Sequence, residues 1–235
     1  MTERRTAAVI GATGVVGGGI VRELAGGGWR VIGIARDATR LHRLEQQNPG
    51  IETVSGSVES DGEAVDLAGR VGKLSSRIDA IVTSINLPRV SVRLLDITAN
   101  QLVETMRGNL VTHHCAARAF IPLLAPGGRY VGIGGGMADF ILPGMGPVSL
   151  CQAAQRNMFR FFALETEAVD VSIVELILAS MIVDSCDDAT ADPRQIRADE
   201  VGEHVRAVLE HADRFPGPIL MLKSRKQVGQ PEQQA

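Results

Sequence analysis

Three glycines near the start of the chain have the spacing of a loop that binds the phosphates of a dinucleotide. Gly11, Gly14 and Gly17 follow an apolar run (7–10) that predicts a strand, and they precede an apolar-periodic segment from Ile20 that predicts a helix. In that order the first glycine permits a tight turn, the second lets backbone N–H groups approach a pyrophosphate, and the third lets helix and strand pack closely. The helix N-terminus adds partial positive charge. We predict cofactor binding by Gly11, Thr13, Gly14, Val15, Val16 and Gly17; the alternative is a glycine-rich surface turn.

The end of the second predicted strand indicates which dinucleotide is bound. Residues 29–35 form this strand, Ala35 stands where an acid for NAD is expected, and Arg36 follows it. An acidic residue here binds the free ribose 2′-hydroxyl of NAD, whereas an arginine binds the 2′-phosphate of NADP. We therefore predict NADP(H) with Arg36 as a cofactor-binding residue. There are two alternatives. Asp37 binds the ribose of NAD instead, or Arg36 only caps a solvated turn.

Strands and helices alternate along the rest of the chain. This alternation predicts an α/β fold, a single-domain Rossmann fold with a doubly wound parallel sheet of about seven strands flanked by helices. The domain is expected to span 1–226, followed by a polar tail at 227–235. The predicted strands after the second are 51–54, 78–84, 129–133, 171–178 and 219–222. The predicted helices are 15–25, 38–47, 62–74, one from Asp96 or Thr98 to about 124, one at 149–168 beginning near Ser149, and 198–211.

Composition narrows the class of protein. The 235 residues are 45% hydrophobic and 22% charged, with a formal net charge of −3. This balance disfavours nucleic acid as a partner, and no run approaches the roughly 20 apolar residues that span a bilayer. Three scattered cysteines do not predict disulfides or a metal site. We expect a cytoplasmic protein without a signal peptide that binds a small molecule.

Several segments together resemble the short-chain dehydrogenase/reductase family. They are the glycine loop 11–17, Asn109 in a helix, the run 127–133 and the C-terminal segment 217–220. The resemblance implies an NAD(P)-dependent oxidoreductase, Ser84 near the cofactor, and Asn109 in the catalytic site. It also implies a homo-oligomer, or a hetero-oligomer with a related chain, because two long helices form the dimer interface of the family. Met158, Phe159, Phe161 and Phe162 make one of those helices apolar on several faces.

The chain lacks the acid–base chemistry that the resembled family uses. Its serine, tyrosine and lysine positions correspond to Gly135, Val148 and Gln152. The only tyrosine is Tyr130, within a predicted strand, and no lysine occurs between Lys73 and Lys223. A Tyr-x-x-x-Lys pair is therefore absent from the whole chain. Because a phenol needs a lowered pKa to exchange protons at neutral pH, the standard mechanism is absent too.

Other residues are candidates for the missing groups. We consider Asp139 and His113 as acids, with a solvated loop and a helix-packing role as their alternatives. His113 lies four residues after Asn109 and is expected to share its helix face. Gln152 is a candidate for contact with the nicotinamide ribose. Further candidates are His114, Ser149 as a helix cap, Cys151 as a nucleophile, and Asp184 and Asp187 in a lid.

Three functions are compatible with this pattern. The first is an NADP(H)-dependent oxidoreductase that acts on a carbonyl or alkene by a non-standard mechanism. The second is a non-redox enzyme on the same fold, such as a cyclase, isomerase or lyase. The third is a non-catalytic nucleotide-sensing regulator or an inactive partner subunit. The loops 85–95 and 180–197 are mostly apolar or acidic, which favours a neutral, fairly apolar ligand.

Overall fold

A seven-stranded parallel sheet forms the centre of the described molecule. The computed structural model describes residues 4–86, 91–184, 192 and 195–231. The strand order β3-β2-β1-β4-β5-β6-β9 confirms the predicted doubly wound α/β fold. The strands are β1 (Thr6–Ile10), β2 (Arg30–Ala35), β3 (Glu52–Ser55), β4 (Ile78–Thr83), β5 (Leu124–Gly135), β6 (Val171–Leu178) and β9 (Ile219–Leu222), with β7 (Ile182–Val183) and β8 (Ile196–Arg197) paired separately.

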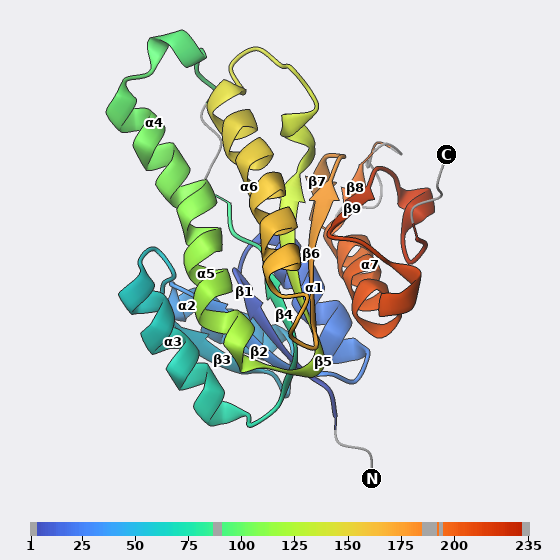
Figure 1. The fold of residues 1–235 in the computed structure, drawn as a ribbon. Coiled ribbons are helices and arrows are strands. Elements are labelled where there is room, and N and C mark those ends of the chain that lie inside the picture. The colour runs from blue at the N-terminus through green and yellow to red at the C-terminus, as the bar shows by residue number, and fades with distance from the viewer. Residues whose placement is uncertain (1–3, 87–90, 185–191, 193–194, 232–235) are drawn as a thin grey trace.

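Helices cover both faces of this sheet (Figure 1). Apolar residues of α1, α2 and α7 pack on one face, and those of α3, α5 and α6 pack on the other. Because the strands are buried on both faces, they are almost continuously apolar. The helices are α1 (Val15–Gly26), α2 (Ala38–Gln47), α3 (Asp61–Leu74), α4 (Ala99–Met106), α5 (Thr112–Phe120), α6 (Gly146–Glu165) and α7 (Ala198–Glu210).

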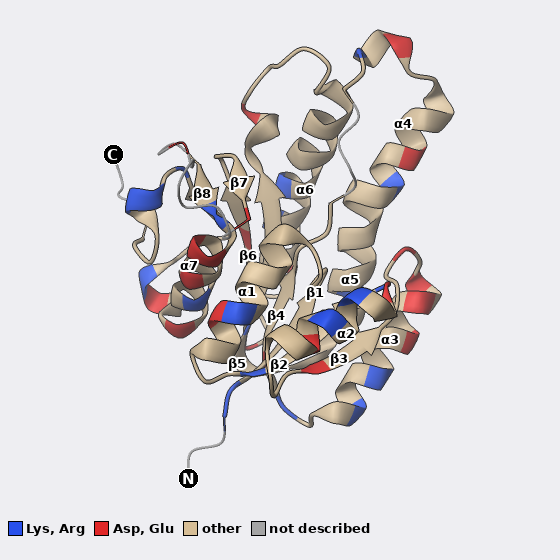
Figure 2. Ribbon diagram, turned by 180° about the vertical axis from the view of Figure 1, so that it is seen from behind, with Lys and Arg blue, Asp and Glu red and all other residues tan. Residues whose placement is uncertain are grey.

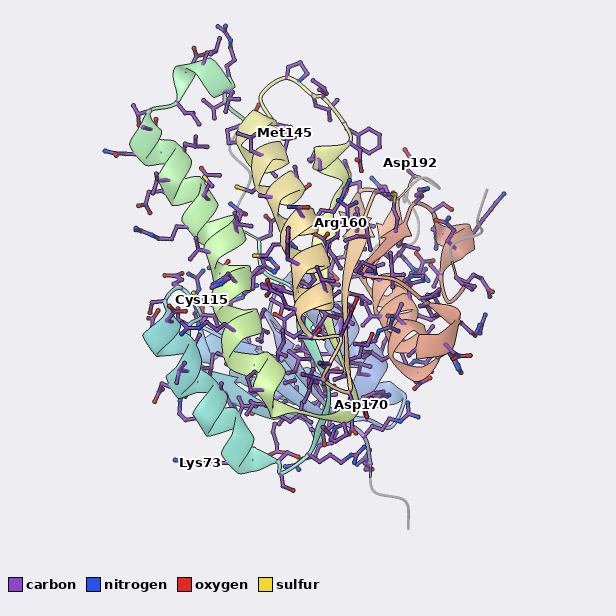
Figure 3. All side chains as sticks on the ribbon, in the orientation of Figure 1. Lys73, Cys115, Met145, Arg160, Asp170 and Asp192 are labelled. Carbon is purple, nitrogen blue, oxygen red and sulfur yellow. The ribbon has the colours of Figure 1, made fainter. Side chains whose placement is uncertain are left out.

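The strand order reverses between β1 and β4, and this reversal determines where a ligand fits. β1 pairs with β2 on one side and with β4 on the other, so the chain leaves the sheet centre in opposite directions. Open α/β sheets bind ligands at the carboxyl edge of such a point. In Figure 3, Met145 marks the start of α6 near this edge, and Asp170 marks the opposite edge, just before β6 begins.

Two helix predictions need correction. The helix expected at 149–168 begins at Gly146, so Ser149 is not its N-cap; its backbone N–H donates within the helix to the carbonyl of Met145 at 2.9 Å. The single long helix expected up to about residue 124 is interrupted by a π-helical turn, η2 (Arg107–Val111), between α4 and α5. Its predicted start is confirmed, because Thr98 caps α4 in a capping box with Gln101.

The segment predicted to be a polar tail begins in contact with the domain. Val228 packs on the apolar core beneath α7, and the backbone N–H of Gly229 donates to Nδ1 of His204 at 3.2 Å. The chain therefore remains in contact with α7 past residue 226, and residues 232–235 lie outside the described part.

Charged side chains are distributed unevenly over the surface. Figure 2 shows acidic and basic residues along α7, α2 and α3, whereas the loop that leads into α6 carries few. Within the described residues, none of the helices combines the length and the hydropathy that crossing a bilayer requires.

Candidate functional site

The glycine loop has the geometry that its spacing predicts. Gly11 has φ +84°, and a Cβ there would lie 2.8 Å from the carbonyl carbon of Ser84. A Cβ at Gly17 would lie 2.8 Å from the carbonyl carbon of Gly11, so only glycine lets α1 approach β1 this closely. Gly14 is the N-cap of α1 in extended conformation. The first N–H groups of α1 thus lie at the carboxyl edge of the sheet, where they can bind an anion.

A cavity of about 350 Å³ lies between this loop and the end of β2. Arg36 lines it and forms an ion pair with Glu59. Arg40 also lines it and donates to the carbonyl oxygen of Thr13, although the sequence analysis did not single it out. Asp37, the residue considered for NAD, caps α2 by accepting from the backbone N–H of Arg40 at 3.0 Å. Two guanidinium groups therefore lie where the predicted 2′-phosphate would bind.

A second cavity of about 700 Å³ continues from the first towards α6. Ser84, Ile85 and Asn86 line both cavities, so the two form one elongated cleft. The described residues that line the second cavity include no Asp, Glu, Lys, Arg, His or Tyr. Of the predicted site residues, it contains Val15, Val16, Ser84, Asn109, Gly135, Val148, Cys151 and Gln152.

Glycines at the end of β5 make room for side chains from other elements. A Cβ at Gly132 would lie 2.5 Å from Cε1 of Phe159. At Gly134 it would lie 2.9 Å from Cδ of Glu175. At Gly135, the position of the family serine, it would lie 2.8 Å from Cδ of Gln152 and closer still to Nε2. The space that a serine side chain would need is therefore occupied by the Gln152 amide.

A backbone hydrogen bond orients the Gln152 amide. The backbone N–H of Met137, in the turn η4 (Gly136–Ala138) after β5, donates to Oε1 of Gln152 at 2.8 Å. Because an N–H group donates only to an acceptor, this contact identifies the amide oxygen and leaves Nε2 on the other side. Gln155, one turn further along α6, is used differently, since its Nε2 donates to the buried carbonyl of Ile133 at 3.1 Å.

Asn109 lies in the wall of the second cavity, within the π-helical turn. Its Nδ2 donates to the carbonyl of Thr105 at 2.9 Å. A π turn inserts one extra residue into a helix and is frequent at functional sites. Cys151, opposite on α6, directs its thiol to the same carbonyl at 3.7 Å, and burial raises its pKa. This raised pKa disfavours the thiolate that a nucleophile needs.

The structure does not bring His113 to the cavity. Its ring is buried and packs edge-on against Phe159, whereas Asn109 lines the cavity. Its Nε2 lies 3.1 Å from the carbonyl oxygen of Ile85. Burial lowers the pKa of His113 to about 4, which keeps the ring neutral at pH 7. His114 is exposed on α5 beside Phe162 and does not line the cavity either.

The predicted acid Asp139 is engaged in an ion pair. Both of its oxygens accept from Arg156 on α6, at 2.7 and 2.9 Å, and it does not line the cavity. The Arg156 guanidinium holds the pKa of Asp139 below its usual value, which disfavours it as a proton donor. The pair ties the loop after β5 to α6. Asp184 is exposed outside the cavity lining, and Asp187 lies outside the described residues.

A buried carboxyl group that the sequence analysis missed lies directly behind the cavity wall. Glu175 on β6 is buried, and its Oε2 has no hydrogen-bond partner within the described part of the chain. Burial raises its pKa to about 8, and the charges of Arg156 and Arg160 oppose this only in part. The available sequence signal was a single charged residue in the apolar strand 171–178. Glu175 contacts Gly134, which lines the cavity, but it does not line the cavity itself.

Sheet order, glycine loop and cleft together define a dinucleotide-binding α/β protein of the Rossmann type. The family model described as enoyl-(acyl carrier protein) reductase matches residues 11–215. The chain belongs to the short-chain dehydrogenase/reductase family. No curated protein matches it in sequence.

Solved structures from several organisms share the fold. An alcohol dehydrogenase from Thermococcus sibiricus complexed with 5-hydroxy-NADP is 23% identical, with a TM-score of 0.79 over 99% of this chain and 100% of that one. An NADPH-bound short-chain oxidoreductase from Pseudomonas aeruginosa PAO1, described as containing an atypical catalytic center, is 22% identical. Its TM-score is 0.70 over 77% of this chain and 73% of that one. A metagenomic short-chain oxidoreductase in complex with NADP is 19% identical, with a TM-score of 0.78 over 93% and 96%.

Proposed function

We propose that the protein is an NADP(H)-dependent oxidoreductase that reduces a carbonyl or alkene of a neutral, fairly apolar small molecule. The observation that carries this proposal is the continuous cleft from Arg36 at one end to Gln152 at the other, with the glycine loop along its wall. A cleft of this shape fits an extended dinucleotide and leaves the wider end for substrate.

The residues present fit this cofactor. The N–H groups at the start of α1 would bind the pyrophosphate, and Arg36 and Arg40 would bind the 2′-phosphate. Val15, Val16 and Ser84 lie along the path towards the nicotinamide end. When bound, the cofactor supplies the hydride, so the protein contributes binding, orientation and polarisation of the substrate. The NADP and NADPH complexes of the structural neighbours support this assignment.

The wide end of the cleft favours an uncharged substrate. Phe140, Leu142 and Met145 line it, and its described lining residues carry no charged side chain. A carboxylate or phosphate on the substrate would lose hydration there without gaining a cation. The proposed substrate is therefore neutral and apolar around its reactive group.

Cofactor titration followed by a turnover assay tests the proposal. Purified protein is titrated with NADPH and NADH by fluorescence, and NADPH oxidation is then followed at 340 nm with quinones, enones and simple ketones. Saturable NADPH binding with turnover of one of these classes is expected. Binding without turnover would favour the nucleotide-sensing regulator or partner subunit, and absence of binding would favour the non-redox enzyme.

Replacing Arg36 with alanine is expected to weaken NADPH binding by about tenfold or more, because a charge-assisted hydrogen bond contributes about 1.5–3 kcal/mol. NADH lacks the 2′-phosphate, so its affinity should change little. The two dissociation constants, measured side by side, check this expectation. Glu59→Gln is the matched control, since it removes the partner of Arg36 and should leave NADPH binding equal or tighter. An equal loss for NADPH and NADH in the Arg36 variant would contradict the assignment.

We also propose that the chain assembles through α5 and α6, as predicted from its family. Phe159 packs in the core, but Phe161 and Leu164 on the same helix are more than half exposed. Phe161→Glu is expected to convert an oligomer into a monomer in light scattering, because it places a charge in an apolar interface. Val65→Glu, at an exposed apolar residue on α3, is the control. An unchanged mass for the Phe161 variant would exclude this face.

A further inference from the structure

We propose that Nε2 of Gln152 is the hydrogen-bond donor that holds the substrate oxygen, in the space that the family serine would fill. We further infer that the substrate is a quinone or an α,β-unsaturated carbonyl compound. This inference rests on the proposed oxidoreductase function and specifies which chemistry its site can perform.

The orientation of the amide is determined by its neighbour in η4. Met137 donates its backbone N–H to Oε1 at 2.8 Å, so the oxygen faces the backbone after β5. Nε2 carries two hydrogens, and within the described residues it donates to no acceptor. Gln152 lines the second cavity and is only partly buried. Its donor capacity is therefore available to a ligand in that cavity.

The position of Nε2 is that of a side chain at residue 135. A Cβ at Gly135 would overlap Nε2 and lie 2.8 Å from Cδ of Gln152. In the family, the residue at 135 is the serine that polarises the substrate carbonyl. Nε2 thus brings an N–H group to the place from which the hydroxyl would act. The sequence predicted a different role for Gln152. It stands at the position of the family lysine, and we expected it to contact the nicotinamide ribose as that lysine does.

An amide donor restricts the reaction. Gln152 can stabilise developing negative charge on an oxygen, but it cannot transfer a proton to it. Around it, the described cavity wall offers only Cys151 as a titratable group, and that thiol contacts the carbonyl of Thr105. The proton that completes the reduction must then come from water.

The electron balance selects the substrate class. A hydride brings two electrons and one hydrogen to the substrate, and the negative charge collects on the oxygen held by Nε2. A simple ketone would become an alkoxide, which is too basic to form without a strong acid nearby. A quinone becomes a hydroquinone anion, and an enone becomes an enolate, and both spread the charge by conjugation. One proton from water then completes either product.

A phenol serves as a probe of the donor without turnover. 4-Nitrophenol is titrated between pH 5 and 9 with the NADP⁺-loaded protein, and its phenolate is followed by absorbance. Because Nε2 stabilises the oxyanion, we expect the pKa of the bound phenol to be about one unit lower in the wild type than in Gln152→Ala, equivalent to about tenfold tighter binding of the phenolate. Gln152→Glu should raise this pKa above that of Gln152→Ala, through repulsion between carboxylate and phenolate.

Asn157→Ala is the matched control, since Asn157 is an exposed amide side chain on the same helix that does not line the cavity. It should leave the pKa of the bound phenol as in the wild type. An equal pKa in the wild type and Gln152→Ala, or a wild-type protein that does not bind the probe, would overturn the inference. So would a Gln152→Ala variant that loses only NADPH affinity, which would assign the residue to the ribose.

Failure of the proposed function gives a different result. A protein that binds neither NADPH nor NADP⁺ is not the proposed oxidoreductase, yet its cofactor-free form can still be titrated with the phenol. In the turnover assay, we expect quinones and enones to be reduced and simple ketones to be inert. Gln152→Ala should lower kcat by about tenfold or more, with little change in the KM for NADPH. Turnover of simple ketones would overturn the assigned substrate class.

Discussion

Gly17→Ala is expected to destabilise the protein and to abolish NADPH binding. The new Cβ would lie 2.8 Å from the carbonyl carbon of Gly11 and 3.1 Å from Cα of Ala12. Both are backbone atoms, so α1 must move away from β1. Overpacking of this kind costs about 1–3 kcal/mol, and each kcal/mol lowers the Tm by roughly 2–4 °C in a chain of this size. The shift also moves the N–H groups that would bind the pyrophosphate, so we expect an affinity loss of at least tenfold in a fluorescence titration.

The adjacent glycine provides a closely matched control. A Cβ at Gly18 would meet its nearest neighbours, the carbonyl oxygen of Ala12 and Nη1 of Arg22, at 3.7 Å, which is ordinary contact distance. Gly18 also lies inside α1, where alanine is favoured over glycine by about 1 kcal/mol. Gly18→Ala should therefore raise the Tm slightly and preserve NADPH binding. Equal behaviour of the two variants would show that the packing of Gly17 is not critical.

Glu175→Gln is expected to remove a pH dependence from the stability of the protein. Burial raises the pKa of Glu175 from 4.5 to about 8, so between these values the folded state holds a proton that the unfolded chain has released. Stability is then lost as pH rises from about 4.5 to 8, by up to about 1.4 kcal/mol per pH unit. Glutamine has no proton to lose, so the advantage of the variant over the wild type should grow across this window and level off above pH 8.

Urea unfolding at a series of pH values measures this difference. The comparison is cleanest between pH 7 and 8. Burial lowers the pKa of His113 and His204 to about 4. The stability that these neutral rings contribute is lost only as pH falls below about 6.5, which is outside this window. Arg156 and Arg160 are the charged groups that act on Glu175. Glu165→Gln, at the exposed end of α6, controls for the loss of one carboxylate. A constant difference between wild type and Glu175→Gln from pH 5 to 9 would mean that Glu175 is ionised in the folded protein.

Local sequence patterns were sufficient to predict the sheet and the glycine loop. The alternation of apolar strands with periodic helices depends on neighbouring residues, and so does the role of Gly17. The π turn around Asn109 was not predictable in this way, because one inserted residue leaves the apolar periodicity nearly intact. The position of His113 was not predictable either, because its ring packs against Phe159 of a distant segment and does not line the cavity with Asn109.

The interior of the candidate site could not be predicted from the sequence, because it depends on contacts between distant segments. Asp139 is separated from Arg156 by 17 residues, and only the fold shows that the two form an ion pair. Glu175 could be recognised as unusual in its strand, but its contact with Gly134 could not. The sequence placed Gly135 at the serine position and Gln152 at the lysine position. It did not indicate that the Gln152 amide fills the space beside Gly135.

The overlap between residue 135 and Gln152 also means that substitutions at these two positions affect each other over evolutionary time. A serine introduced at 135 while Gln152 is unchanged meets the terminal amide of that flexible side chain, which must then move aside and release its bond to Met137. If Gln152 is replaced first, only its bond to Met137 is lost, and the serine then has room. A change of this site towards the family's serine is thus easiest when Gln152 is replaced first.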